Sequence, residues 1–225
     1  MRSYKILFFC CIFGLIILVN TIIAYEKPDA KKILDKYYSS VTGFGISIED
    51  QNNITKHGGC PTYGEITEES TAQLIDYLKP KSTDVFVDAG SGIGKVALQF
   101  LISSDINKSI GIELSNERHK KAADILETLK KNNEIPQGKI LEFYNQDILD
   151  ADLSQTTIFF MCSTCFSLDL MKKITDKLAK LKPGMRVITL KQLPANENFK
   201  LIHQMDLAMT WSPSSLVYIY ELIHN

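Results

Sequence analysis

The sequence lacks a marked excess of charge of either sign. Its 25 lysine and arginine residues nearly balance its 26 aspartate and glutamate residues, giving a formal net charge of −1 at pH 7. Proteins that bind nucleic acid by neutralising phosphates usually carry a basic surplus. The richest basic run, residues 120–131, also contains Asp124 and Glu127 and is typical of a solvent-exposed helix face. The charge balance therefore gives no strong signal for a nucleic-acid partner.

The chain also lacks a cysteine pattern typical of a disulfide-rich protein. Two of the five cysteines lie in an apolar N-terminal stretch, which leaves Cys60, Cys162 and Cys165. Because this number is odd, no disulfide framework is expected. The chain has no internal repeat and no low-complexity segment, and its 45% hydrophobic and 23% charged residues are ordinary for a globular protein. The length beyond the apolar stretch corresponds to about one domain.

The N-terminal stretch is distinct from the rest of the chain. Arg2 and Lys5 precede an apolar run that continues to Ala24, so residues 1–24 are expected to be a signal peptide or a membrane anchor. As a single helix, residues 6–24 would span roughly 28 Å, which is just enough to cross a bilayer. If the segment is retained, the positive-inside rule slightly favours a globular part that faces the cytosol.

The remaining chain alternates between helical and strand-like patterns. Strands are expected at residues 84–88, 109–113, 140–144, 157–161 and 185–190. Helices are expected at residues 27–40, 67–78, 95–102, 116–131 and 167–180, while residues 41–62 are interpreted as irregular. Strands that alternate with helices of this length predict a parallel sheet covered on both faces.

The C-terminal end has a different pattern. Residues 201–210 and 216–223 are strand-like and are separated by Ser212-Pro213-Ser214, with no room for a helix between them. They should form an antiparallel hairpin at the sheet edge. The whole pattern predicts a doubly wound, mostly parallel, seven-stranded sheet of the Rossmann-like methyltransferase type. The expected organisation is the N-terminal segment 1–24, a lead-in of residues 25–62, and the main domain, residues 63–225.

The strongest local motif follows the first expected strand. That strand ends at Asp88, and Gly90-Ser91-Gly92 and Gly94 form a glycine-rich turn before the next helix. Such a turn brings the backbone and the free N–H groups of a helix N-terminus close to a ligand. In dinucleotide-binding proteins a related turn seats a pyrophosphate, which the carboxylate of Asp88 would repel. An ammonium group suits this carboxylate better, and S-adenosylmethionine carries one.

Two more acidic residues follow strands of the same sheet. Glu113 ends the second strand, where doubly wound folds place a carboxylate that binds the ribose hydroxyls; the adjacent Leu114 is assigned to the same site. Asp147 follows the third strand and could accept the adenine amino group while Ile148 packs on the ring. Because Asp88, Glu113 and Asp147 all occupy carboxyl ends of strands, together they predict an S-adenosylmethionine site at the switch point.

Further motifs make the sequence resemble a known family. Tyr63-Gly64-Glu65, a helix and then residues 86–94 look like the disruptor-of-telomeric-silencing (Dot-one) histone-lysine methyltransferases, which lack a SET domain. The resemblance covers about residue 61 to the C-terminus. Besides these motifs it includes Glu113, residues 157–191 with Phe166, and the terminal residues Trp211 and Tyr218.

This resemblance implies roles for individual residues. Tyr63 and Glu65 would belong to a loop that closes over the cofactor, and Gly90, Glu113 and Asp147 would bind it. The walls of a channel for a substrate lysine would come from Phe166, Trp211 and Tyr218. Cys162 and Ser163 stand where the family has an asparagine pair, beside the methyl donor, and Lys95 stands where the family has glutamine.

Elementary chemistry agrees with these roles. Methyl transfer from a sulfonium is an in-line displacement that needs a neutral amine, held close and aligned. A narrow aromatic channel desolvates lysine, which lowers its pKa, and aromatic faces attract the methylated cation. We therefore predict an S-adenosylmethionine-dependent protein-lysine N-methyltransferase whose partner presents a lysine. Its donor is a cytosolic metabolite, so a membrane-anchored or secreted enzyme should work in a cytosol that supplies it.

Several alternatives stay open. A membrane-anchored methyltransferase of a non-histone protein or a small molecule fits the N-terminal segment, although Leu114 follows Glu113 where such lysine methyltransferases have asparagine and proline. Cys162 and Cys165 could form the dithiol of a thiol oxidoreductase. Together with His57 and Cys60 they could bind zinc. Trp211 and Tyr218 could simply be the core of an edge hairpin.

Overall fold

The computed structural model describes residues 11–12, 15–16 and 29–224. The predicted signal or anchor segment lies largely outside the described residues; within it, strands β1 (Cys11–Ile12) and β2 (Leu15–Ile16) pair with each other in antiparallel fashion. None of the helices in the described part of the chain is long and apolar enough to span a bilayer. The role of residues 1–24 stays a prediction.

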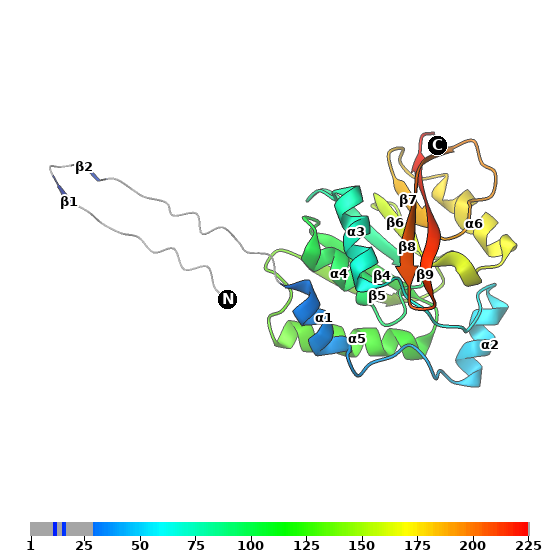
Figure 1. Ribbon diagram of the computed structural model, residues 1–225, viewed down its shortest axis with the longest axis horizontal. Helices are drawn as coiled ribbons and strands as arrows, with labels where there is room; N and C mark the ends of the chain where they lie inside the picture. Colours follow the sequence, from blue (N-terminus) through cyan, green and yellow to red (C-terminus); the bar gives the residue numbers. More distant parts are fainter. Residues whose placement is uncertain (1–10, 13–14, 17–28, 225) are drawn as a thin grey trace.

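A seven-stranded sheet with the order β5-β4-β3-β6-β7-β9-β8 forms the centre of the molecule (Figure 1). Five strands are parallel: β3 (Val85–Ala89), β4 (Lys108–Glu113), β5 (Ile140–Asn145), β6 (Ile158–Met161) and β7 (Arg186–Thr189). The edge is the antiparallel hairpin β8 (Phe199–Met209) and β9 (Ser212–Leu222). This confirms the predicted fold class.

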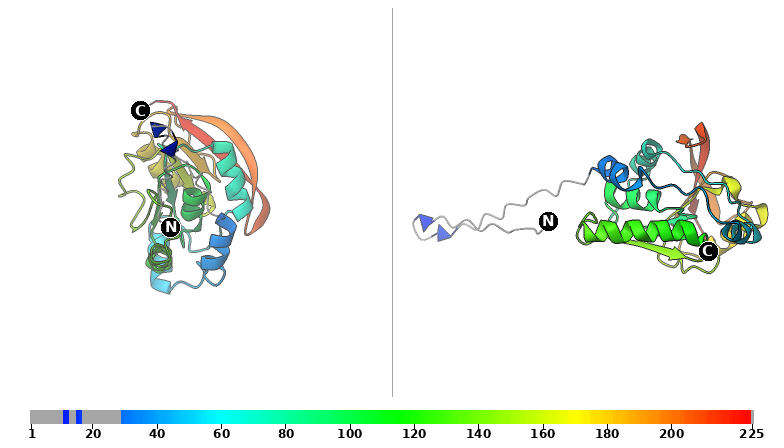
Figure 2. Two further views of the ribbon diagram at one scale, coloured as in Figure 1. Left: turned by 90° about the vertical axis from the view of Figure 1, so that its left-hand side faces the viewer. Right: turned by 90° about the horizontal axis from the view of Figure 1, so that it is seen from below.

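Helices cover both faces of the sheet, as Figure 2 shows from two further sides. Buried side chains of α1 (Ala30–Tyr38), α3 (Glu68–Leu78), α4 (Lys95–Ser103) and α5 (Asn116–Lys131) share one core with Phe86 and Phe160. Helix α6 (Leu168–Leu178) packs on the opposite face, in a second core with Val87 and Phe159. Neighbouring strand residues thus point to different cores, as the two-residue period of a strand requires.

One helix in the lead-in contradicts the prediction that residues 41–62 are irregular. Helix α2 (Ile48–Lys56) begins after Ser47, whose side-chain oxygen accepts a hydrogen bond from the Asp50 N–H at 3.3 Å. Its sequence is mostly polar, and only Asp50 and Ile54 are buried. An apolar periodicity is therefore absent, and the local signals are confined to the helix ends: the N-cap serine, the acidic first turn and Lys56 in the last turn.

The hairpin turn is tighter than predicted. Met209 pairs with Ser212, so Thr210 and Trp211 form the turn and Pro213 lies within β9. Proline lacks an N–H and is tolerated where a strand has an unpaired side. Only residues 218–221 of β9 pair with β7, so Pro213 meets this condition.

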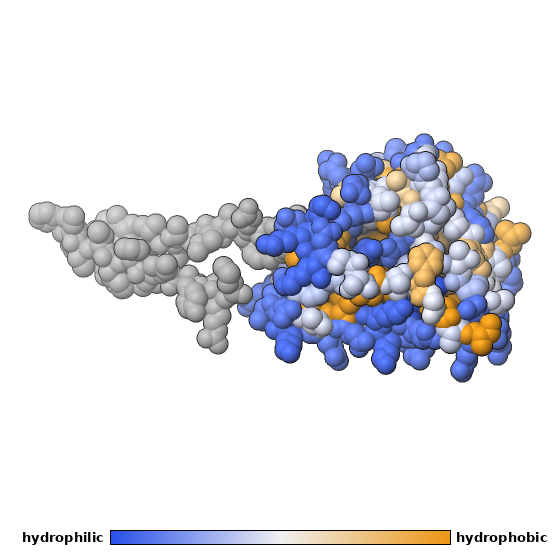
Figure 3. Space-filling model, turned by 60° about the horizontal axis from the view of Figure 1, so that its bottom comes forward, coloured by the Kyte–Doolittle hydropathy of each residue, from blue (hydrophilic) through white to orange (hydrophobic). Residues whose placement is uncertain are grey.

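The lysine-rich part of α5 is exposed, as predicted. Lys120, Asp124, Glu127 and Lys130 face solvent, while Leu129 is buried. The face of the molecule that Figure 3 displays is largely hydrophilic, with hydrophobic residues confined to separate patches. The mixed charges of this helix therefore belong to a solvated surface.

Candidate functional site

The glycine-rich turn links β3 to α4 at the carboxyl edge of the sheet. Gly90, Gly92 and Gly94 all have positive φ values, of 80°, 56° and 86°, a conformation that residues with a Cβ rarely adopt. The N–H groups of Gly90 and Ser91 donate to the carbonyl of Ile112, at 2.8 and 3.1 Å. The turn is thereby fastened to the end of the neighbouring strand β4.

Glu113 is placed to bind a diol. One of its carboxylate oxygens accepts the Gly92 N–H at 2.7 Å, and the other accepts the Ser115 N–H at 2.8 Å. Each oxygen keeps a second lone-pair site, which suits the two hydroxyls of a ribose. Burial raises the pKa of this carboxyl, while the two backbone hydrogen bonds oppose the rise.

Asp88 is a second buried carboxyl group, only 3% exposed. Burial raises its pKa well above the ordinary value, and the negative charges of Glu113 and Glu65 raise it further. A positively charged ligand beside these three carboxylates would reverse this effect. S-adenosylmethionine carries an ammonium and a sulfonium, so the charge of the cleft fits this cofactor.

Two neighbouring cavities contain the predicted cofactor residues. The larger is lined by Gly90, Glu113, Leu114, Asp147 and Ile148, and the smaller by Glu65, Asp88, Gly90, Ser91 and Gly92. Both cavities also share Tyr63, Gly64 and Cys162. Gly94 lines neither; a Cβ there would come within 2.3 Å of the Phe143 ring, so its role is close packing at the start of α4.

The Tyr63-Gly64-Glu65 segment covers the smaller cavity. The Tyr63 hydroxyl donates to one carboxylate oxygen of Glu65, and the Lys95 ammonium lies 2.5 Å from the other. A Cβ on Gly92 would come within 2.7 Å of the Tyr63 ring, which places that ring directly on the glycine-rich turn. This segment therefore has the position expected of a lid over the cofactor.

The terminal hairpin holds this lid from outside. Thr210 bonds to Glu65 twice: its N–H donates to the Glu65 carbonyl at 2.8 Å, and its hydroxyl accepts the Glu65 N–H at 3.0 Å. The Trp211 ring lies against Gly64, where a Cβ would come within 2.3 Å of it. Trp211 itself is 48% exposed and lines neither cavity.

Two buried charged side chains that sequence reasoning missed join the lead-in to α5. Asp50 of α2 caps α5: its carboxylate accepts the Ser115 hydroxyl at 2.5 Å and the Glu117 N–H at 3.0 Å. From α5, Arg118 donates to the carbonyls of Gly43 and Pro61, at 3.0 and 2.6 Å, and lies over the Tyr63 ring. An isolated aspartate or arginine gives no local signal of such long-range partners.

The turn after β6 separates the two residues predicted beside the methyl donor. Cys162 lines both cavities, and burial, followed by the nearby Asp88 and Glu65 carboxylates, raises the pKa of its thiol to about 12. The thiol is therefore neutral at physiological pH. Ser163 is fully buried, its hydroxyl 2.6 Å from that of Thr189 and accepting the Lys191 N–H at 3.0 Å. It holds the turn in place and lines neither cavity.

The predicted lysine channel is brought together only in part. Phe166 lines the larger cavity, and its ring comes within 3.6 Å of a Cβ built on Gly90. Tyr218 is half-buried in β9 beside Thr189 and lines neither cavity. Of the three aromatic residues, only Phe166 therefore lines one of these two cavities.

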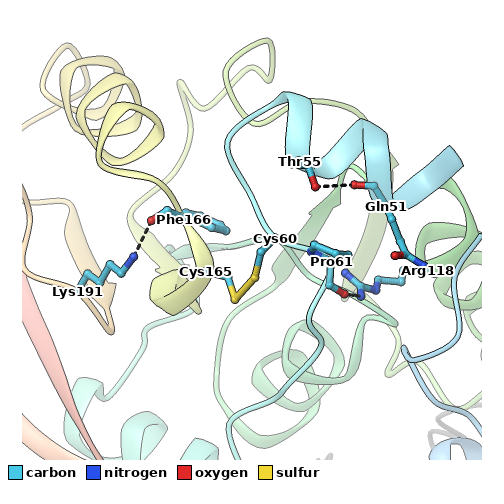
Figure 4. The surroundings of a disulfide bond; sticks show 8 residues. All are labelled: Gln51, Thr55, Cys60, Pro61, Arg118, Cys165, Phe166 and Lys191. Carbon is cyan, nitrogen blue, oxygen red and sulfur yellow. Dashed lines mark hydrogen bonds between the residues drawn. A yellow bond between two sulfur atoms is a disulfide. The ribbon is translucent and has the colours of Figure 1, made fainter. Parts of the chain in front are cut away.

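The pairing of the cysteines differs from the dithiol and zinc alternatives. Cys60 and Cys165 form a disulfide, with their Cα atoms 5.3 Å apart (Figure 4). Cys162 is a free thiol. The odd cysteine count implied no disulfide framework and did not predict this bridge, which makes Cys165 unavailable for a dithiol with Cys162. Within residues 29–224, no cluster of histidine, cysteine or acidic side chains could hold a metal ion, so the zinc alternative finds no site there.

The chain is similar to known histone methyltransferases in sequence. The family model described as "Histone methylation protein DOT1" matches residues 49–213. H3 lysine-79 specific histone-lysine N-methyltransferases from Caenorhabditis elegans and Dictyostelium discoideum are 33% and 34% identical over 159 and 139 residues. These alignments cover 66% and 58% of this chain, which spans only 16% and 8% of the two relatives.

A shorter relative and the solved structures extend the comparison. A protein-lysine N-methyltransferase of Saccharolobus islandicus is 24% identical over 127 residues, covering 56% of this chain and 74% of that protein. An RNA methyltransferase from Salinibacter ruber, solved with S-adenosyl-L-homocysteine, has a TM-score of 0.52 at 20% identity, covering 71% of this chain and 94% of its own. Magnesium protoporphyrin IX methyltransferase from Synechocystis has a TM-score of 0.52 at 15% identity, covering 86% and 99%. These structures share the fold.

The buried acid Asp88 leads to a prediction about stability. A carboxyl whose pKa is higher in the folded state binds protons more readily there, so stability falls as the pH rises from the unfolded pKa through the raised one. At neutral pH, Asp88→Asn should therefore stabilise the ligand-free protein by about 0.5–2 kcal/mol, the range of a single stabilising substitution.

Thermal unfolding at pH 7 and at pH 4.5 checks this prediction. The stability difference between Asp88→Asn and the unaltered protein should shrink at the lower pH. Asp124→Asn, on the exposed face of α5, serves as the matched control and should change little. A destabilised Asp88→Asn variant at pH 7 would contradict the conclusion that the buried Asp88 carboxylate lowers the stability of the protein when no cationic ligand is bound.

Proposed function

Because the chain belongs to the DOT1 histone methylation family, we propose that it is an S-adenosylmethionine-dependent protein-lysine N-methyltransferase. One observation carries the proposal: Asp88, Glu113 and Asp147, at the carboxyl ends of three adjacent strands, line adjoining cavities under a lid. The family and fold identify S-adenosylmethionine as the cofactor, and a carboxylate-lined site fits its charge.

The donor would bind with its parts distributed between the two cavities. Glu113 would accept both ribose hydroxyls, and Asp147 with Ile148 would take the adenine, in the larger cavity. Asp88 would face the ammonium in the smaller cavity, beneath Tyr63 and Glu65. Cys162, which lines both, would then lie near the sulfonium, where a neutral thiol cannot compete with the substrate as a nucleophile.

The proposal also concerns how the substrate lysine reaches the methyl donor. Phe166, Trp211 and Tyr218 would wall the approach of the substrate side chain. Support comes from Phe166 beside Gly90, from Trp211 on the lid residue Gly64, and from Tyr218 beside Thr189, whose hydroxyl contacts Ser163. Aromatic walls would desolvate the amine and favour its neutral, nucleophilic form. A histone is the first substrate to test, and another lysine-bearing protein is the alternative.

Donor binding depends on Glu113 in this scheme. Glu113→Ala should weaken binding of S-adenosylhomocysteine roughly 10- to 100-fold, because two hydrogen bonds to a charged group are lost. Isothermal titration calorimetry measures this directly. Glu142→Ala is the matched control, since Glu142 pairs with Lys108 at the amino end of β4, opposite to Glu113, and lines neither cavity. A Glu113→Ala variant that is folded and binds normally would refute the donor site.

Trp211 should affect transfer rather than donor binding. Trp211→Ala should reduce methyl transfer to a lysine-bearing protein at least tenfold, while the affinity for S-adenosylhomocysteine changes less than threefold, because Thr210 still bonds to the lid at Glu65 and the lost ring acts on the acceptor side. Leu216→Ala, also exposed on the hairpin, is the control. The measurement is mass spectrometry of lysine methylation on histone H3 and on other basic proteins. Unaltered transfer by Trp211→Ala would exclude this residue from the channel.

For localisation, we propose that residues 1–24 direct the protein to a membrane or across it, and that the domain works where a cytosol supplies the donor. Either the segment anchors a cytosol-facing domain, or the protein is delivered into another cell. Fractionation with intact-mass measurement of the protein from its producing cell tests this. Membrane association, or a mature chain lacking about the first 24 residues, is expected; a full-length protein in the soluble fraction of that cell would contradict it.

A further inference from the structure

The disulfide joins two walls of the larger cavity that are far apart in sequence. Cys60 lies in residues 58–62, a segment here called the strap, which leads from α2 to the lid. Cys165 ends the short 3-10 helix η1 (Ser163–Cys165), between β6 and α6, 105 residues later. Both half-cystines line the cavity, together with Tyr63 on one side and Phe166 on the other.

The far wall of the cavity is held independently of the disulfide. The Ser163 hydroxyl bonds to Thr189 and to the Lys191 N–H, and the Lys191 ammonium donates to the Phe166 carbonyl at 2.6 Å. Figure 4 shows this last contact beside the disulfide. The turn that carries Cys165, residues 163–166, is here called the post. It is fixed to the end of β7 by these hydrogen bonds.

The strap crosses from this post to the opposite side of the cavity. At one end, the Ser167 N–H donates to the Gly58 carbonyl at 2.7 Å, and Cys60 bonds to Cys165. At the other end, Arg118 of α5 donates to the Pro61 carbonyl. Without the disulfide, one backbone hydrogen bond and the packing around Gly58 would join the strap to the post. A crosslink that closes so long a loop restricts the chain far more than one hydrogen bond does.

We propose that the Cys60–Cys165 disulfide is a redox-controlled clasp that holds the strap, and with it the lid residue Tyr63, in the donor-binding position. This inference rests on the proposed donor site and adds its regulation. In the oxidised form the cavity is preorganised. A dithiol reductant transfers two electrons and two protons to the bond, leaving two thiols on the protein and a disulfide on the reductant; the strap is then free to move and donor affinity falls.

The remaining cysteine of the site does not interfere with this switch. Thiol–disulfide exchange requires a thiolate, and burial beside Asp88 and Glu65 raises the pKa of the Cys162 thiol to about 12. Cys162 therefore stays protonated while the clasp is oxidised. A disulfide also agrees with passage through an oxidising compartment, which residues 1–24 would provide if they export the protein and would not provide if they anchor a cytosol-facing domain.

The test compares donor affinity in the two redox states of the full-length chain. Mass spectrometry of a non-reducing digest first shows whether Cys60 and Cys165 are linked. S-adenosylhomocysteine is then titrated calorimetrically into the oxidised protein and into protein reduced with dithiothreitol. Reduction is expected to weaken binding at least tenfold. The double variant Cys60→Ser/Cys165→Ser should bind as weakly as the reduced protein and should not respond to dithiothreitol.

Each outcome has one meaning. Equal affinity before and after reduction, an unlinked pair in oxidised protein, or a dithiothreitol response that persists in the double variant would overturn the clasp. Failure of the oxidised, folded protein to bind at all would instead overturn the donor site. If the double variant does not fold, hydrogen exchange in the reduced, unaltered chain decides: faster exchange in residues 58–66 is expected, and unchanged exchange there would refute the proposal.

Discussion

Buried negative charge at the carboxyl edge of the sheet is the constraint on which the rest of this structure depends. Asp88 and Glu113 end adjacent parallel strands, and both are removed from water. Desolvated carboxylates are costly unless hydrogen bonds or cations compensate them. Glu113 receives two backbone N–H groups, whereas the pKa of Asp88 is raised by burial and by like charges. The site is thus organised to bind a cationic group of a ligand.

The lead-in segment completes this site although it precedes the main domain in sequence. Asp50 caps α5, Arg118 returns from α5 to the Gly43 and Pro61 carbonyls, and Tyr63 lies on the glycine-rich turn. Charged groups buried with good partners fix one arrangement, because breaking any of them leaves an uncompensated charge. The end of the lead-in, from Ile54 to Thr62, therefore lines the larger cavity, and Asp50 and Gly43 help to fix it to α5.

Sequence reasoning predicted the features that depend on short-range patterns. The parallel strands, the edge hairpin, and the turn through Gly90, Gly92 and Gly94 all follow from apolar runs and from backbone conformations that need glycine. Helix α2 was not predicted, because its residues are mostly polar and exposed and therefore show no helical periodicity of apolar side chains. Likewise, Ser163 resembled an active-site residue in sequence, and only the packing of β7 shows that its hydroxyl is used internally.

Long-range pairings formed the other class of missed features. No local pattern joins Cys60 to Cys165, and an odd cysteine count implied no disulfide framework that would have suggested a pairing. Similarly, nothing near Thr210 indicates that it bonds to Glu65, although Trp211 beside it was already assigned to the site. Such contacts depend on the strand order. It places the turn after β6 and the turn of the hairpin on the same side of the sheet as the carboxyl ends of the strands, where the cofactor motif lies.

A crystal structure of the full-length chain with S-adenosylhomocysteine tests the central claim most directly. The account predicts ribose hydroxyls on both oxygens of Glu113, the amino group facing Asp88, and the adenine against Ile148, with Tyr63 and Glu65 closed over the ligand. A ligand bound outside these two cavities, or one whose ribose leaves Glu113 uncontacted, would contradict the account.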